Sequence, residues 1–277
     1  MKKYYLIALV LFVFCFGFIQ QQHLAVIAKK NTISAGNDYT ADANCMGAFF
    51  MNVAGDELDR SGEGGTLTQT SGTIPTSATV PATYSGTSRV WVAGDSEYLA
   101  GGAADSTNIT GADQDFSIVA WVNVGTCTAA SIYSIVSKFD RGSDPIAQQY
   151  AIQIDGTDTD TFEIDVRIDG NVSTSTTTDL AAGTWYHIAV VYDDSDTGQE
   201  VKIYINASEN ATDSYSGGMT DATTANFAIG SEYNAGSATR PYDGLIDEVA
   251  IFDRVLSPAE VTEIYTYGID GSNGIND

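Results

Sequence analysis

Short strand-like segments separated by turn-forming residues fill most of this chain. The segments are rich in Val, Ile, Thr, Tyr and Phe, and clusters of Gly, Asp, Asn and Ser lie between them. This pattern predicts β-strands joined by turns. The clearest segments are residues 116–122, 150–154, 162–168, 184–193, 201–206, 227–230 and 242–252. One large β-sandwich is therefore expected, and no fixed-period repeat divides it.

Two of these segments differ in how their faces are covered. From Phe116 to Val122, apolar residues occupy both the even-numbered positions and the odd-numbered Val119 and Trp121. Because successive strand residues point to opposite faces, this strand should be covered on both sides. The segment from Phe162 to Ile168 instead alternates apolar with charged residues. That alternation predicts a strand with one face in solvent.

One helix is expected near the C-terminus. Ser257 is suited to the N-cap, Pro258 to the first helical position and Glu260 to the third, which together form a capping box. The helix should run to about Tyr267, and Gly268 supplies a stop. We expect it to pack near one edge of the sandwich.

The order of the later segments is more informative than any one of them. It reads W-Y-H-I-A-V-V-Y-D, V-K-I-Y-I-N, F-x-I-G and G-L-I-D-E-V, and L-S-P-A-E follows at the helix start. This order resembles laminin-G-like domains of the concanavalin A-like superfamily. Residues 47–52, 59–67 and 89–99 are similar to the opening of such domains. The resemblance implies an all-β fold, a two-sheet antiparallel jelly roll with a short C-terminal helix, over residues 45–268.

The same resemblance implies a structural calcium ion where the opening loop meets the last strand. Asp59 and Asp247 occupy those two places. Calcium takes about six to eight oxygen ligands, so loop carbonyl groups and water would complete the site. The alternative is that Asp59 caps its own turn and Asp247 accepts hydrogen bonds from backbone N–H groups. We expect calcium at these two residues.

The N-terminal segment indicates export. Lys2 and Lys3 precede an apolar run from Tyr4 to Ile19, which is typical of a secretory signal peptide, expected here over residues 1–28. The alternative is an uncleaved anchor, although the run is shorter than the ~20 residues of a spanning helix. A membrane is therefore expected as a partner only through an uncleaved N-terminal segment.

The remaining boundaries and the charge follow from composition. Residues 29–44 are polar without periodicity and are expected to be a linker, and residues 269–277 are expected to be a tail. The formal net charge is −24. A surface of this charge repels nucleic acid and anionic membranes, and it is typical of a soluble extracellular protein.

Two cysteines remain outside the expected signal peptide, Cys45 and Cys127. An oxidising compartment would allow them to form a disulfide. Small buried thiols are also common in protein cores. The sequence leaves both arrangements open.

No complete set of catalytic residues is recognisable. Glycoside hydrolases of this fold carry E-x-D-x-x-E, whose two glutamates serve as nucleophile and acid. Glu163 and Asp165 begin that pattern, but Ile168 stands in the place of the second glutamate. His187 lies within an apolar segment and is expected to be structural. We therefore expect no enzyme activity, and a glycoside hydrolase-related protein is the less favoured alternative.

Binding is the class of function that remains. Sugar-binding modules of this fold use aromatic faces beside polar loop residues. Trp121 and Trp185 lie in apolar segments and are expected in the core. Tyr215, Tyr233 and Tyr242 lie in loop-like sequence and are candidate ligand-binding platforms, the alternative being that they cover the rim of the sandwich.

Two functional classes stay open at this stage. The first is a secreted, lectin-like carbohydrate-binding or adhesion module, whose partner is an extracellular glycan. The second is a structural or protein–protein interaction domain of the laminin G type, whose partner is a surface protein. Fold resemblance alone does not decide between them.

Overall fold

The structure is a computed structural model, which describes residues 36–272 except 64, 83, 103–106, 108, 110–114, 143–147, 178, 216–218 and 220–224. The described residues belong to one compact unit. The signal peptide expected over residues 1–28 lies outside them. Among the described residues, no helix has the length and apolar character needed to cross a membrane.

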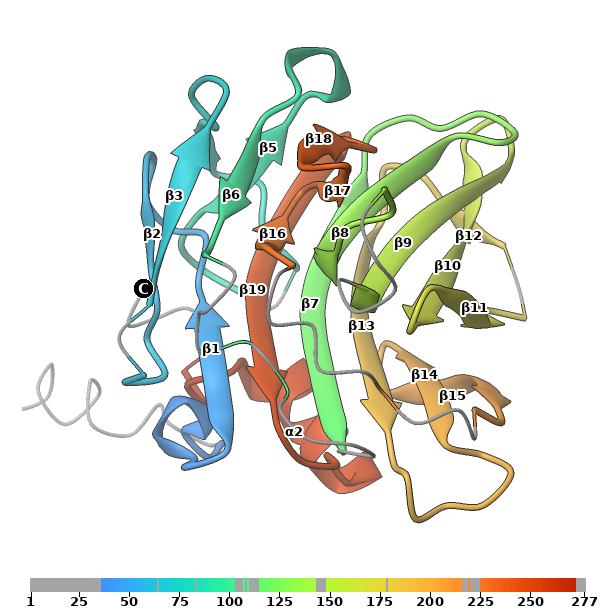
Figure 1. Cartoon of the computed structure of the whole chain (residues 1–277). Helices are drawn as coiled ribbons and strands as arrows, with labels where there is room; N and C mark the ends of the chain where they lie inside the picture. Colours follow the sequence, from blue (N-terminus) through green and yellow to red (C-terminus); the bar gives the residue numbers. More distant parts are fainter. Residues whose placement is uncertain are drawn as a thin grey trace, which may run out of the picture. The chain divides into compact units, whose positions relative to one another are not determined.

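Two antiparallel sheets make up the fold (Figure 1). The eight-stranded sheet has the order β15 (Ser208–Asp213), β14 (Val201–Ile205), β13 (Trp185–Tyr192), β7 (Phe116–Val124), β19 (Gly244–Phe252), β5 (Ser88–Trp91) and β4 (Thr76–Ser77), with β1 (Cys45–Phe49) also on β19. The nine-stranded sheet has the order β11 (Asn171–Ser175), β10 (Thr161–Ile168), β9 (Gln148–Asp158), β8 (Ile132–Phe139), β16 (Phe227–Ile229), β6 (Tyr98–Ala100), β3 (Thr66–Thr70) and β2 (Glu57–Leu58), with β12 (Leu180–Ala181) also on β10.

Smaller elements complete the fold. They are the hairpin of β17 (Glu232–Asn234) and β18 (Ser237–Thr239), the 3₁₀ helices η1 (Tyr39–Ala41) and η2 (Ala93–Asp95), and helix α2 (Pro258–Tyr267). The predicted all-β, two-sheet antiparallel sandwich with a short C-terminal helix is confirmed.

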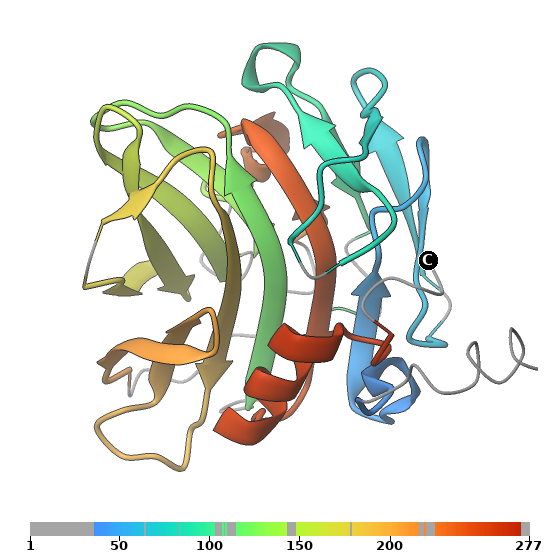
Figure 2. The same cartoon turned by 180° about the vertical axis from the view of Figure 1, so that it is seen from behind.

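Helix α2 covers the outer face of the eight-stranded sheet (Figure 2). Val261 and Ile264 of the helix pack against Val119 of β7, Ala189 of β13 and Ala250 of β19. This cover explains why the outer residues of β7 are apolar, and every residue of that strand is buried. The helix lies over the face of the sheet, whereas the sequence analysis placed it near an edge.

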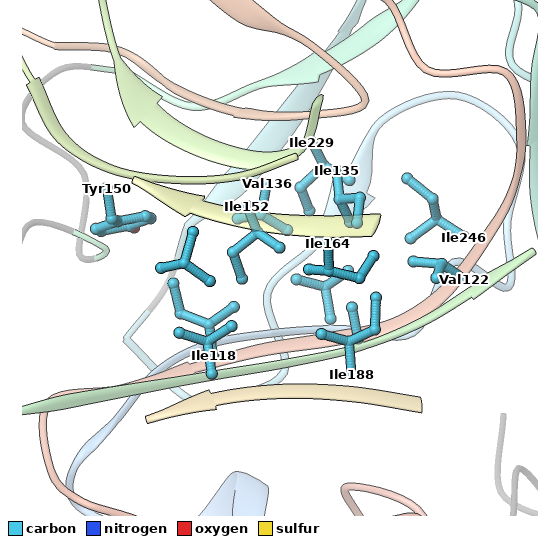
Figure 3. Packing of buried hydrophobic residues seen from close by; sticks show 14 of the residues in the cluster. Ile118, Val122, Ile135, Val136, Tyr150, Ile152, Ile164, Ile188, Ile229 and Ile246 are labelled. Atoms are coloured by element: carbon cyan, nitrogen blue, oxygen red, sulfur yellow. The ribbon is translucent and has the colours of Figure 1, made fainter. Parts of the chain in front are cut away.

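The main core lies between the two sheets (Figure 3). Ile118 and Ile188 of the eight-stranded sheet face Ile152 and Ile164 of the nine-stranded sheet. Alternate residues of each strand point into this layer, as the period of two predicts. Removing this apolar surface from water is the largest favourable term in folding.

The segment that precedes β1 is part of the folded unit. The backbone N–H of Tyr39 donates to the carbonyl of Ile269 over 2.8 Å, and the Tyr39 hydroxyl donates to Glu263 over 2.9 Å. Tyr39 and Ile269 are both buried. The expected linker over residues 29–44 is therefore wrong for residues 36–44, and the expected tail is wrong for Ile269.

The two cysteines are free, so the disulfide considered for them is not formed. Cys45 lies in the layer beneath α2, and Cys127 lies in the core between the sheets. Each occupies a buried apolar site of its own. Burial raises the pKa of Cys45 to about 12, which keeps it a thiol at neutral pH.

Helix α2 begins and ends where the sequence predicts. The Ser257 hydroxyl accepts from the Glu260 N–H over 3.3 Å, and the Glu260 carboxylate accepts from the Ser257 N–H over 2.8 Å. Gly268 ends the helix with a φ of 81°, which glycine adopts without steric strain.

The capping box gives a first prediction. Ser257→Ala leaves the Glu260 N–H without its acceptor, so the free energy of unfolding should fall by about 1 kcal/mol. Urea denaturation measures the change. Ser208→Ala, at an exposed position of β15, is the control. A Ser257→Ala protein as stable as this control would contradict the role of the cap.

Candidate functional site in an aromatic pocket

A cavity of about 440 Å³ opens on the outer face of the eight-stranded sheet, beside α2. Cavities of this size accommodate small ligands. It is lined by Val80, Ala82, Trp121, Gly183, Thr184, Trp185, Asn206 and Tyr265. We call this cavity the aromatic pocket.

Strands β7 and β13 place the two tryptophans of the pocket. They are antiparallel neighbours in which His187 lies opposite Trp121, and Trp185 lies opposite Asn123. The even-numbered residues of both strands, such as Ile188, point into the core between the sheets. The odd-numbered tryptophans therefore point to the outer face.

Trp121 forms a fixed wall of the pocket. Its ring stacks on Tyr265 of α2 with centroids 5.5 Å apart, and Tyr84 approaches it edge-on at 5.3 Å. The Tyr84 hydroxyl donates to the Ile264 carbonyl over 3.0 Å, which ties the loop before β5 to the helix. Only 5% of Trp121 is exposed, so its expected burial is confirmed.

Trp185 supplies the more accessible aromatic ring of the pocket. It is half-buried, and no ring contact joins it to another aromatic residue in the described part of the chain. The expectation that Trp185 belongs to the core is wrong. It stands at the start of β13, where only residues further along the strand contribute to the layer beneath α2.

Polar groups lie beside this indole. Asn206 sits in the turn between β14 and β15, where its side-chain oxygen accepts from the His187 N–H over 2.9 Å. Its own N–H donates to the His187 carbonyl over 2.8 Å. With the oxygen used in this way, the amide NH₂ is the group that can donate to a ligand. Thr184 adds an exposed hydroxyl.

His187 supports the pocket from within the protein. Its ring lies 5.3 Å from that of Trp121 and 5.8 Å from that of Tyr265. Neither ring nitrogen has a hydrogen-bond partner among the described residues. Burial lowers its pKa from 6.5 to about 3, so the imidazole is neutral at physiological pH.

The candidate tyrosines do not line the aromatic pocket. Tyr242 is fully buried edge-on to Trp91, and Tyr233 is 5% exposed and packs edge-on to Tyr98. Neither is an exposed platform, and this prediction is wrong for both. Tyr215 is half-buried, and its ring packs against the core rather than standing free.

The predicted calcium ligands are engaged by the protein itself. The Asp59 carboxylate accepts from the N–H groups of Ala48 and Ser61, over 2.9 and 2.8 Å, and from the Ser61 hydroxyl. Asp247 accepts from the Glu248 N–H over 3.0 Å. Within the described ranges, no group of three His, Cys, Asp or Glu side chains could hold a metal. These contacts are those of the turn-capping alternative.

A second polar group lies on the outer face of the nine-stranded sheet, and the sequence analysis missed it. Arg141 and Arg240 contact Glu232, with nitrogen–oxygen distances of 2.6 and 3.3 Å. Arg167 donates to the Gln153 side chain over 2.8 Å. The three guanidinium groups are thus held by Glu232 of the β17–β18 hairpin and by Gln153 of β9.

Glu163 and Asp165, the residues considered for catalysis, lie in β10 on that same outer face. Burial raises the pKa of Glu163, and the nearby carboxylates of Asp179 and Asp165 raise it further. Ile168, in the place of the second glutamate, is fully buried in the core. The described part of this strand therefore has no second glutamate to complete the retaining or inverting pair.

The buried imidazole gives a pH prediction. In the unfolded chain the histidine has its ordinary pKa of about 6.5, so between about pH 6.5 and 3 the unfolded state binds a proton that the folded state does not. Stability should therefore fall as the pH falls through this window. In His187→Phe, the free energy of unfolding should decrease between pH 7 and 5 by about 2 kcal/mol less than it does in the wild type. Urea denaturation at the two pH values measures it, and equal losses would contradict the assignment.

Calcium at Asp59 and Asp247 stays a prediction of the family resemblance, which melting curves decide. An ion bound only by the folded chain raises Tm, and its removal lowers Tm. The expected result is that EDTA lowers Tm, that calcium restores it, and that Asp247→Asn abolishes this effect. A Tm that neither calcium nor EDTA changes would favour the turn-capping alternative.

Comparison with known proteins places this geometry in a fold family. Domain 4 of AbnA, a GH43 extracellular arabinanase from Geobacillus stearothermophilus solved in complex with arabinotriose, is 20% identical, with a TM-score of 0.54 over 80% of this chain and 98% of that chain. The binding domain of Paraclostridial Mosquitocidal Protein 1 is 14% identical, with a TM-score of 0.57 over 80% of this chain and 52% of that chain.

A mutant of Trypanosoma rangeli sialidase with trans-sialidase activity is also similar. It is 12% identical, with a TM-score of 0.57 over 93% of this chain and 39% of that chain. Identities this low show the shared fold alone. No curated protein matches the sequence.

A laminin-G-type family model matches residues 68–262, which is more than half of the chain. The match covers the strands that form the aromatic pocket and the first half of helix α2, and it ends before Tyr265. By sequence and by fold, the chain belongs to the concanavalin A-like lectin/glucanases superfamily.

Proposed function

We propose that this protein is a secreted, non-catalytic module that binds extracellular carbohydrate through the aromatic pocket. One observation carries the proposal: Trp185 is half-exposed in a cavity where the amide of Asn206 and the hydroxyl of Thr184 lie beside it. A partly exposed indole offers its face to a ligand, and the polar groups beside it can form hydrogen bonds that fix the ligand's orientation.

The chemistry of the lining suits a sugar ring. The apolar C–H face of a sugar stacks on an indole, and its hydroxyl groups form hydrogen bonds around the edge. The Asn206 amide can donate to a ring hydroxyl, and the Thr184 hydroxyl can donate or accept. The stacked pair of Trp121 and Tyr265 keeps the wall of the pocket rigid, which reduces the ordering needed on binding.

Fold and context support this assignment. The similar domain of the arabinanase is described in complex with arabinotriose, a carbohydrate. The apolar N-terminal segment after Lys2 and Lys3 supports export, where extracellular glycans are the available partners.

A binding role fits the pocket better than catalysis. None of its lining residues is a carboxylate, a cysteine or a histidine, so the cavity as described offers no pair of groups for acid–base hydrolysis. Glu163 lies on the other sheet and lacks its second glutamate.

Removal of the exposed indole tests the proposal. Trp185→Ala removes the stacking surface, so binding to glycans on an array should weaken about tenfold or more. The protein is displayed in clustered form, because a shallow site binds weakly as a monomer. Tyr215→Ala, a change of another half-buried aromatic residue, is the control.

Two results would contradict the proposal. Glycan binding that Trp185→Ala leaves unchanged would place the site elsewhere. Capture of a surface protein by clustered wild type that binds no glycan would replace carbohydrate recognition with a protein–protein interaction domain.

A further inference from the structure

The lining of the aromatic pocket carries no charge. Its side chains are aromatic, aliphatic, hydroxyl or amide groups, as far as the structure describes the cavity. Neutral hydroxyl groups of a sugar can be satisfied by such groups. A ligand carboxylate or sulfate would lose water on entry without meeting a cation, which is unfavourable.

Acidic side chains lie near the Trp121 wall of the pocket. Asp247 lies directly opposite Trp121 in the pairing of β19 with β7, so the two share the outer face, and both Asp247 and its neighbour Glu248 are buried. Tyr265 belongs to the last turn of α2, where the helix dipole places partial negative charge. The whole chain has a formal charge of −24. The partial negative charge at the end of the helix and the net charge of the chain both disfavour an anion in the cavity.

The clustered arginines do not supply the missing cation. Arg141, Arg167 and Arg240 lie on the outer face of the nine-stranded sheet, with Glu232 and Gln153 as partners. The aromatic pocket opens on the outer face of the eight-stranded sheet, so the two sheets of the sandwich lie between the arginines and the pocket.

We propose that the aromatic pocket selects uncharged glycans and rejects glycans whose bound unit carries a carboxylate or sulfate. This inference rests on the proposed function and adds the class of ligand. The selectivity arises from an uncharged lining within a negative field, and not from a specific repulsive side chain in the cavity.

The test uses one oligosaccharide in two forms. The first form is a neutral oligosaccharide that the wild type binds, and the second has its primary hydroxyl group oxidised to a carboxylate. The wild type should bind the oxidised form at least about tenfold more weakly at low salt. Added salt should reduce this difference in affinity only in part. Salt screens the long-range repulsion, but it does not remove the cost of stripping water from the carboxylate.

A gain of function makes the test sharper. Thr184 is exposed at the pocket, so Thr184→Lys places a cation beside the bound unit without disturbing the core. It should reduce the difference between the two forms to about threefold or less. Thr197→Lys has the same charge change at an exposed position in the turn after β13, at the opposite end of the strand from Trp185, and should leave the difference unchanged.

The outcomes separate this inference from the proposed function. Equal binding of the two forms by the wild type, with both lost in Trp185→Ala, overturns the selectivity and leaves the carbohydrate site in place. An equal effect of Thr184→Lys and Thr197→Lys shows that net charge alone is responsible, and overturns the role of the lining. Failure to bind any neutral oligosaccharide overturns both proposals.

Discussion

Burial of the eight-stranded sheet on both faces is the constraint on which the rest of the structure depends. Its inner face packs against the nine-stranded sheet, and its outer face packs beneath α2 and the segment around Tyr39. Strand β7 is buried along its whole length as a result. A strand in this position cannot alternate apolar and polar residues, and its outer side chains become part of a second apolar layer.

The aromatic pocket lies where this second layer ends. Tyr265 of α2 covers Trp121, but the cover does not extend to Trp185 at the start of β13. The neutral ring of His187 fills the space beside Trp121 and Tyr265. Regular elements supply the aromatic residues of the pocket and turns supply Gly183, Thr184 and Asn206. The stacked wall of Trp121 and Tyr265 is fixed by the packing that stabilises the domain.

The elements that the sequence predicts well are those set by local chemistry. Alternation of apolar and charged residues identified β10, and runs of apolar residues identified β7 and β13. The capping box at Ser257 and Glu260 identified α2. The site was harder to predict. An apolar strand sequence indicates that the strand is covered, but it does not show at which residue the covering helix ends. Trp121 lies within β7 beneath Tyr265 of α2, whereas Trp185 is the first residue of β13 and lies beyond that cover.

Residues in turn-like sequence were misjudged for a related reason. Tyr242 precedes β19 amid Pro, Asp and Gly, yet its ring packs in the core against Trp91. Asn206 was missed as a pocket residue, although its place in the short turn between β14 and β15 was a local signal. Side-chain direction in such turns depends on tertiary contacts, which a single sequence does not contain.

The central claim is that a neutral glycan binds at Trp185, and the three tryptophans of the chain allow a direct measurement. Nuclear magnetic resonance of ¹⁵N-labelled protein gives one indole N–H signal for each of them. During titration with a neutral oligosaccharide, the signals of Trp185 and Trp121 should shift together, and that of Trp91, which is 1% exposed in the core, should not move. Saturable binding that leaves the Trp185 signal in place, and instead shifts backbone signals of β9 and β10, would contradict the account.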